Sequence, residues 1–312
     1  MRIVFVGLGG VGGMVGGKLL AGLAGAPEHE IIFWCRGETL AAVKENGLKV
    51  SSNDGEFTVR PSLATCSADE VKTADLLVFA VKNYHLETAI RDLAPLANSK
   101  TIVLPLLNGV SALETLEKQL PQCDTLGGCA YVFAHAERPG VIKQAGALQR
   151  IVFGKKGISE AENLTRYGAI EQVLKKSGFD ITLTEKIDVA MWSKLVFLSP
   201  LAGVTTLSNR SVSEVLAHEE SFETLKQLLR EIENLARAKN IALPEDVVET
   251  SLERAHSLAP FSKTSMQLDH ENGRQTELES LIGYICREGK AMGVSIPTYE
   301  KVYDGLKRIC KV

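Results

Sequence analysis

The chain has 312 residues, of which 45% are hydrophobic and 23% are charged, and its formal net charge is −3. This composition is typical of a globular protein, and the length favours two domains of about 100–200 residues each. The small negative net charge gives no sign of the basic patch that binding of nucleic acid or of a membrane surface normally needs, so neither is an expected partner.

The first half of the chain alternates short apolar runs with stretches in which apolar residues have helical spacing. Strands are expected at 3–6, 31–35, 76–81, 101–104 and 151–153, and a helix at 11–24. Strands that are separated by helices form βαβ units and a mainly parallel sheet. We therefore predict an α/β domain with a Rossmann-type doubly wound sheet over residues 1–183.

Long helical patterns dominate from about residue 185 onward. Helices are expected at 222–239, 246–255, 276–292 and 298–309. The first of these carries an apolar stripe made of Leu225, Leu228, Leu229, Ile232 and Leu235. We predict an all-α C-terminal domain over residues 184–312. Its apolar helices either bury their own core or form the interface of a homodimer, and the sequence leaves both open.

A glycine-rich segment lies between the first strand and the first helix. It reads Gly7-Leu8-Gly9-Gly10-Val11-Gly12, a G-x-G-x-x-G pattern in the context that dinucleotide binding requires. The first glycine allows a tight turn, the second lets the backbone approach a pyrophosphate, and the third allows close packing. The helix N-terminus presents N–H groups to the phosphates. These six residues are expected to bind a dinucleotide; the alternative is a glycine-rich turn without a ligand.

The end of the second strand indicates which dinucleotide is bound. An NAD-binding strand normally ends in an acid that binds the ribose 2′-hydroxyl. Here Cys35 and Arg36 stand at that point. An arginine can pair with a 2′-phosphate through two charge-assisted hydrogen bonds. Arg36 therefore predicts NADP rather than NAD, unless it is an ordinary surface arginine.

Three further polar residues stand where a ligand is expected. Lys82 follows the strand at 76–81, and ligands of open α/β sheets bind at the carboxyl ends of strands. Asn108 precedes Gly109, and this pair is first of all a turn signal. Lys194 lies among apolar residues, where desolvation lowers the pKa of a lysine. The alternatives are a solvated lysine, a bare turn and a lysine that extends its stem along a core helix.

Five short motifs follow one another along nearly the whole chain. They are the glycine-rich segment, Val81-Lys82, Leu107-Asn108-Gly109, Trp192-Ser193-Lys194-Leu195, and Ser265-Met266 followed by Thr276-Glu277-Leu278. In these motifs the chain resembles the ketopantoate reductase (2-dehydropantoate 2-reductase) family.

The resemblance implies a role for each of these residues. Lys82 and Asn108 would line the site of the cofactor and substrate, and Ser265 would contact the substrate. Lys194 and Glu277 would be the catalytic residues: Lys194 would be the general acid and Glu277 would close the site. The implied activity is NADPH-dependent reduction of ketopantoate to pantoate, a step towards pantothenate and coenzyme A. Hydride transfer to a ketone builds negative charge on its oxygen, which an ammonium can stabilise and protonate.

The sequence departs from the family at two positions. Many members carry asparagines four and eight residues after the catalytic lysine, where this chain has Leu198 and Ala202. Lost polar contacts change which substrate a pocket selects. The substrate is therefore ketopantoate, another 2-oxo acid or a bulkier ketone, and a β-hydroxyacid or opine-type dehydrogenase remains an alternative. A sensor that binds NADP(H) without turnover is a further one.

The remaining residues argue against metal, disulfides and export. None of the six cysteines forms a CxxC pair, and none of the six histidines has ligand-like spacing. The N-terminus does not resemble a signal peptide, and no run approaches the roughly 18 apolar residues of a membrane span. We expect a cytoplasmic enzyme without a metal ion. His135 precedes Pro139-Gly140 and is expected in a loop.

Overall fold

The computed structural model describes residues 1–311 and shows two compact units. The first unit comprises Met1–Leu107 and Ala112–Ile187. The second comprises Asn108–Ser111 and the chain from Asp188 onward. The short segment 108–111 therefore belongs to the second unit, although the chain on both sides of it belongs to the first.

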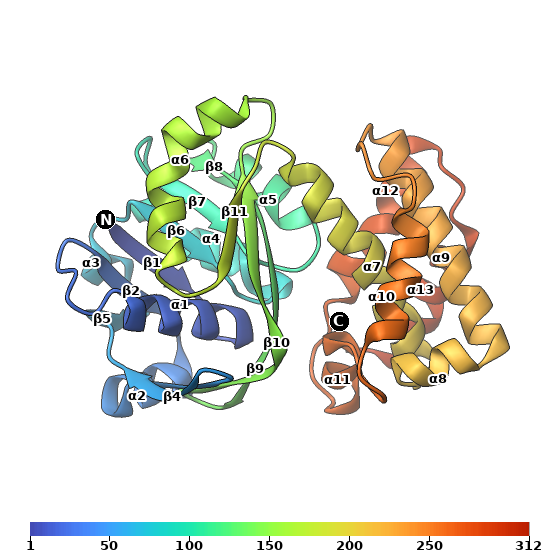
Figure 1. The fold of residues 1–312 in the computed structure, drawn as a ribbon, viewed down its shortest axis with the longest axis horizontal. Coiled ribbons are helices and arrows are strands. Elements are labelled where there is room, and N and C mark those ends of the chain that lie inside the picture. Colours follow the sequence, from blue (N-terminus) through green and yellow to red (C-terminus); the bar gives the residue numbers. More distant parts are fainter. Residues whose placement is uncertain (312) are drawn as a thin grey trace. The chain divides into compact units, whose positions relative to one another are not determined.

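Six parallel strands form the main sheet of the first unit, in the order β5-β2-β1-β6-β7-β8 (Figure 1). Their bounds are β1 (Arg2–Val6), β2 (Glu30–Trp34), β5 (Leu63–Thr65), β6 (Leu76–Phe79), β7 (Ile102–Pro105) and β8 (Asp124–Thr125). The chain builds outward from β1 on one side and then crosses to β6 on the other. This order confirms the doubly wound sheet and places its switch point between β1 and β6.

Alternate residues of the central strands enter two separate hydrophobic cores. On β1, Ile3 and Phe5 face one core, whereas Val4 and Val6 face the other. Both faces are buried, as expected for a parallel sheet covered on two sides. The covering helices are α1 (Gly10–Gly22), α2 (Gly37–Asn46) and α6 (Glu160–Lys175) in the first core, and α3 (Ala68–Val71), α4 (Leu86–Leu93) and α5 (Ser111–Gln119) in the second.

A second, mixed sheet in the first unit was not predicted from the sequence. It has the order β11-β10-β3-β4, and β9 pairs with β10. The bounds are β3 (Leu48–Ser52), β4 (Gly55–Val59), β9 (Gly127–Arg138), β10 (Val141–Gly154) and β11 (Asp180–Leu183). The strand expected at 151–153 is thus the end of β10 and lies outside the main sheet. His135 lies within β9, so the expectation of a loop was wrong.

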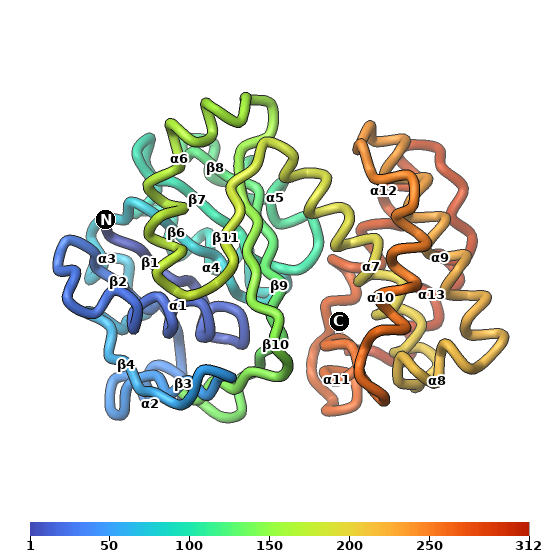
Figure 2. Tube along the Cα trace, viewed as in Figure 1, coloured from blue at the N-terminus to red at the C-terminus, as the bar shows by residue number. Residues whose placement is uncertain are grey.

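Glycines let this second sheet approach α1 closely. A Cβ atom on Gly13 would lie 2.5 Å from Ile142 Cγ1, and one on Gly17 would lie 2.6 Å from Val50 Cγ2. Separations this short are clashes, so larger residues would force the helix and the sheet apart. Figure 2 shows β9 and β10 as one long hairpin. The helix that starts at the glycine-rich segment is therefore packed between the two sheets.

The second unit consists of helices, which confirms the all-α prediction. They are α7 (Ile187–Ser208), α8 (Val212–Ala217), α9 (Glu219–Ala238), α10 (Val247–Ser257), α11 (Ser265–Glu271), η3 (Glu279–Gly283), α12 (Tyr284–Met292) and α13 (Pro297–Ile309). The predicted apolar stripe of α9 is buried along its whole length. The stripe therefore contributes to the core of its own unit.

The helix α7 corrects one expectation of the sequence analysis. By length and composition alone it could cross a membrane, although no such segment was expected. In the structure, 61% of its apolar window is buried inside the protein. A Cβ atom on Gly203 would lie 3.2 Å from both Ile282 Cδ1 and Val302 Cγ1, so neighbouring helices pack tightly against α7. It is a core helix of the second unit.

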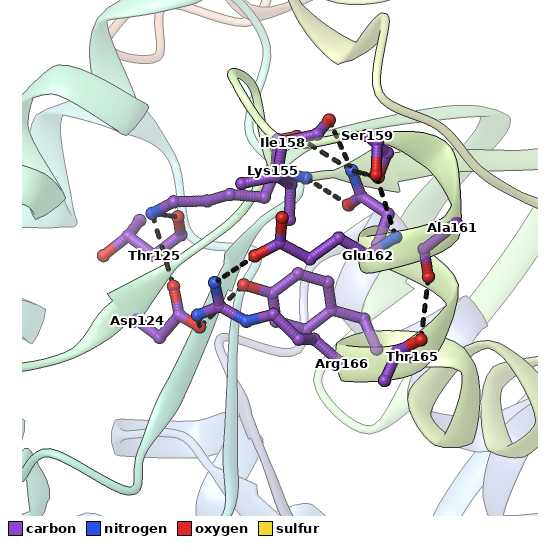
Figure 3. Close-up of polar contacts among 11 residues, drawn as sticks. Asp124, Thr125, Lys155, Ile158, Ser159, Ala161, Glu162, Thr165 and Arg166 are labelled. Atoms are coloured by element: carbon purple, nitrogen blue, oxygen red, sulfur yellow. Dashed lines mark hydrogen bonds and ion pairs between the residues drawn. The ribbon is translucent and has the colours of Figure 1, made fainter.

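A polar cluster ties β8 to α6 in the first unit (Figure 3). The carboxylate of Asp124 accepts hydrogen bonds from Arg166 at 2.8 Å and from the Tyr167 hydroxyl at 2.7 Å. Lys155 Nζ lies 3.3 Å from the same carboxylate. Burial opposes ionisation of Asp124, but the Tyr167 hydrogen bond and the positive charge of Lys155 outweigh it. The pKa of Asp124 therefore lies below its ordinary value.

This lowered pKa predicts a pH-dependent contribution to stability. The contribution is complete above the unfolded-state pKa of about 3.9 and is lost as the pH falls through the lower folded-state value. Asp124→Asn should reduce the free energy of unfolding at pH 7 by about 1–3 kcal/mol. The difference from the wild type should shrink below pH 4. Urea denaturation between pH 3 and pH 8 measures this, with Asp92→Asn on the exposed surface of α4 as the control. If the difference in the free energy of unfolding between Asp124→Asn and the wild type stays constant with pH, the lowered pKa of Asp124 is contradicted.

Candidate active site

The glycine-rich segment forms a tight turn between β1 and α1. Gly7 has a φ of 95°, in the region that favours glycine, and its N–H donates to the Trp34 carbonyl at 2.9 Å. A Cβ atom on Gly12 would lie 2.0 Å from the Gly7 carbonyl oxygen. These positions therefore require glycine for the turn and for close packing.

The same segment has the features needed to hold a dinucleotide. A Cβ atom on Gly9 would meet nothing within 4 Å, so the backbone there borders open space. On Gly10, a Cβ atom would lie 2.0 Å from the Ala134 carbonyl oxygen, which shows that β9 covers the other side of the turn. The first amides of α1 lack acceptors within the helix and can bind an anion. Leu8 is buried and Val11 partly buried, so both anchor the segment.

Arg36 lies just beyond β2, at the N-terminus of α2. Its side chain is exposed, and the guanidinium carbon lies 5.6 Å from the centroid of the Trp34 ring, within cation–π range. Burial lowers the pKa of His85, and the charge of Arg36 lowers it further. The charge of Arg36 therefore acts on the His85 ring, where it disfavours the charged imidazole.

Lys82 follows β6 beside the glycine-rich turn. A Cβ atom on Gly7 would lie 2.7 Å from Val81 Cγ1, so the segment that precedes Lys82 packs against the turn. The carboxyl ends of the paired strands β1 and β6 bring the two segments together at the switch point. Lys82 is partly buried and leads into η1 (Asn83–His85).

Asn108 and Lys194 meet in the second unit. Lys194 Nζ donates a hydrogen bond to Asn108 Oδ1 at 3.0 Å, and both side chains are partly buried. Gly109 has a φ of 87°, which explains why glycine follows the asparagine. On α7, Trp192 and Leu195 are almost completely buried on either side of Lys194. The structure therefore presents an ammonium group whose direction is fixed by an amide oxygen.

Ser265 and Glu277 lie at the starts of two other helical segments of the second unit. Ser265 is the first residue of α11 and is exposed, while Thr264 provides the N-terminal cap. Glu277 is only 5% exposed and shortly precedes η3. Sequence reasoning missed that Thr276 donates from its N–H to the Lys311 carbonyl at 2.9 Å. The C-terminal segment thus pairs with the segment that carries Glu277.

Among residues 1–311 there is no group of three or more histidine, cysteine, aspartate or glutamate side chains that could hold a metal ion. The six cysteines are free thiols, and burial raises the pKa of Cys35 to about 12. A buried thiol of this kind is a poor nucleophile.

Comparison with known families identifies the class of protein that this fold and these groups define. Residues 3–157 match the model of ketopantoate reductase PanE/ApbA, and residues 186–309 match the model of its C-terminal domain. The chain belongs to the ketopantoate reductase family, as its motifs indicated. Members of this family are oxidoreductases that use a nicotinamide dinucleotide.

Two relatives and one further protein of the same fold are similar to this chain. The uncharacterized oxidoreductase YkpB of Bacillus subtilis is 29% identical, over 98% of each chain. The crystal structure of 2-dehydropantoate 2-reductase from Geobacter metallireducens has a TM-score of 0.88 at 26% identity, over 99% of each chain. D-mandelate dehydrogenase, solved with NADH and anilino(oxo)acetate, has a TM-score of 0.85 at 22% identity, over 99% of this chain and 98% of that one.

The open space beside Gly9 predicts a variant that separates cofactor binding from folding. Gly9 has a φ of −75°, which alanine adopts without strain, and the added methyl group meets no protein atom. Gly9→Ala should keep the wild-type melting temperature but weaken dinucleotide binding at least tenfold. Gly12→Ala should instead lower the melting temperature, because its methyl group overlaps the Gly7 carbonyl. Thermal melts and fluorescence titration with NADPH measure both. An unchanged affinity of Gly9→Ala for NADPH would contradict the prediction that a dinucleotide binds in the space beside Gly9.

Proposed function

We propose that this protein reduces ketopantoate, or a closely related 2-oxo acid, with NADPH as the reductant. For ketopantoate the product is pantoate, which would place the enzyme on the route to pantothenate and coenzyme A in the cytoplasm. The observation that carries the proposal is the hydrogen bond from Lys194 Nζ to Asn108 Oδ1. Full-length relatives named 2-dehydropantoate 2-reductase support the choice of substrate.

The chemistry assigns Lys194 the role of general acid. NADPH, when bound, supplies the hydride to the carbonyl carbon. Lys194 stabilises the negative charge that develops on the carbonyl oxygen and donates a proton to it from Nζ, so that the ketone becomes an alcohol. Asn108 accepts from one N–H of the ammonium and so restricts the directions of the other two. We assign Glu277 and Ser265 to the positioning of the substrate. We assign Lys82 to the binding of the cofactor.

The choice of NADPH rests on Arg36. Its guanidinium contacts the Trp34 ring, which restricts a long side chain and lowers the entropy lost when it binds a phosphate. No carboxylate occupies position 35 or 36 to bind a 2′-hydroxyl.

A reductase of a different 2-oxo acid is the alternative that one observation favours. Leu198 and Ala202 follow Lys194 at helical spacing on α7, so the three residues share one face of that helix. Leu198 is partly buried and Ala202 is fully buried. Ala202 is enclosed by the protein itself, so of the two residues Leu198 is the one that can border a substrate, and its apolar side chain suits a substrate with an apolar side chain. D-mandelate dehydrogenase shows that the fold also serves an enzyme named for an aromatic 2-hydroxy acid. A sensor that binds NADP(H) without turnover is the third candidate function.

The oligomeric state is a separate expectation, for which we propose a homodimer.

The cofactor assignment predicts the effect of Arg36→Ala. Loss of the guanidinium should raise the KM for NADPH about 10- to 100-fold, because a charge-assisted contact with the 2′-phosphate is removed. The KM for NADH should change less than threefold. Steady-state kinetics with both cofactors measure this, and Arg36→Lys should recover only part of the preference. An unchanged ratio of the two KM values would rule out this role for Arg36.

The catalytic assignment predicts the effect of two substitutions at Lys194. Lys194→Ala should lower kcat by about 10²–10⁴-fold, the range of general acid catalysis, while NADPH still binds. Lys194→Arg keeps the charge but releases a proton poorly, so it should recover charge stabilisation without proton donation. Turnover is measured with the best 2-oxo acid of the wild type, and NADPH affinity by fluorescence. Near-normal turnover in Lys194→Ala would rule out the general acid role.

A further inference from the structure

The segment after Glu277 departs from α-helical geometry. Over Glu279–Gly283 the chain forms a π-helical turn, in which the Tyr284 N–H bonds to the Glu279 carbonyl, five residues back. This turn, η3, leads directly into α12. Single π-turns are rare in proteins and occur frequently at functional sites. The family-derived roles of the residues around it do not explain why the helix is interrupted here.

Two buried hydroxyl groups hold this turn from other helices. Ser199 Oγ on α7 donates to the Leu281 carbonyl, within η3, at 2.8 Å. The Tyr299 hydroxyl on α13 lies 2.9 Å from Ser199 Oγ. A carbonyl only accepts, so the single Ser199 proton goes to Leu281, and Tyr299 must donate to Ser199. Burial raises the pKa of Tyr299 well above its ordinary value, which keeps that proton in place.

The two hydroxyls must keep their hydrogen bonds, because they lie in a core away from water. Ser199 and Tyr299 both have no exposed surface. A buried hydroxyl without a hydrogen bond costs about 1–3 kcal/mol, and alanine with phenylalanine would occupy nearly the same volume without that cost. The relay from Tyr299 through Ser199 to Leu281 therefore specifies one position of the η3 backbone. A purely apolar core would leave that position less defined.

The position of η3 matters because this turn lies against the segments that carry Asn108 and Glu277. A Cβ atom on Gly109 would lie 3.2 Å from the Ser280 carbonyl oxygen, so η3 supports the turn at Asn108. Ser280 Oγ donates to the Glu277 carbonyl at 3.1 Å, so the same turn also fixes the segment that carries Glu277. Asn108 in turn orients Lys194, which shares α7 with Ser199.

We propose that Ser199 and Tyr299 are positioning residues of the reductase. They fix η3 and thereby set Asn108 and Glu277 in their places around the Lys194 ammonium. The proposal rests on the function assigned above to Lys194. It explains both the interruption of the helix and the two hydroxyl groups in an apolar core.

The test uses Tyr299→Phe, Ser199→Ala and the double variant of the full chain. Ser251→Ala is the control, because Ser251 is also a buried serine but bonds only within α10, to the Val247 carbonyl at 2.6 Å. Kinetics are measured well below the lowest melting temperature of the set. Tyr299→Phe and Ser199→Ala should each lower kcat about tenfold, since small misplacements of catalytic groups reduce turnover steeply. The KM for NADPH should not change. The kcat of the double variant should be no lower than that of the less active single variant, because both residues act through one relay.

A second measurement does not depend on turnover. The rate at which Lys194 reacts with an amine-directed reagent, followed by mass spectrometry, should rise severalfold in both single variants, because its hydrogen bond to Asn108 loosens. It should not change in Ser251→Ala. Reduced melting temperatures with wild-type kcat and wild-type labelling would overturn the proposal. If the wild type reduces no 2-oxo acid, the proposed function fails; increased labelling would then still support the positioning of Lys194, and unchanged labelling would overturn it.

Discussion

The hydrogen bond between Lys194 and Asn108 is the contact on which the proposed site depends. It joins positions 86 residues apart, one on a core helix and one on a short segment. That segment, Asn108–Ser111, belongs to the second unit although its flanking residues build the first. A turn with a positive φ at Gly109 and a close backbone neighbour at Ser280 hold it in place. The chemistry proposed for the protein depends on this short segment.

A second constraint is the packing of α1. Its glycines serve both the turn after β1 and the close approach of two sheets. Gly12 fits only as glycine against the Gly7 carbonyl, and Gly13 fits against Ile142 of β10 for the same reason. Gly9 alone among these borders open space. The pattern of glycines therefore distinguishes positions needed for packing from one position that packing leaves open.

Much of the fold follows from local patterns in the sequence. The apolar runs at β1, β2, β6 and β7 predicted the parallel sheet, and the stripe on α9 predicted a buried helix face. The second sheet was missed because only the end of β10, at 151–153, is an apolar run, while the rest of that strand carries exposed polar residues and glycine and shifts register against β9. The apolar surroundings of Lys194 were recognised, but the full length of α7 was not, because Ser193 and Lys194 divide its apolar residues into shorter runs. The site residues came from motifs, which identify residue types but not contacts. The relay at η3 joins positions 82 and 100 residues apart, and no local signal could have revealed it.

The measurement that tests the central claim most directly is the consumption of NADPH by the purified protein, followed by absorbance. It is run with ketopantoate, with 2-oxo acids that carry apolar side chains, and with NADH in parallel. The account predicts fast, saturable oxidation of NADPH with at least one 2-oxo acid. Turnover with ketopantoate would show that Leu198 and Ala202 are tolerated, and turnover with an apolar 2-oxo acid would show that the pocket has changed its substrate. Tight NADPH binding without turnover of any of these acids would contradict the account and favour a sensor.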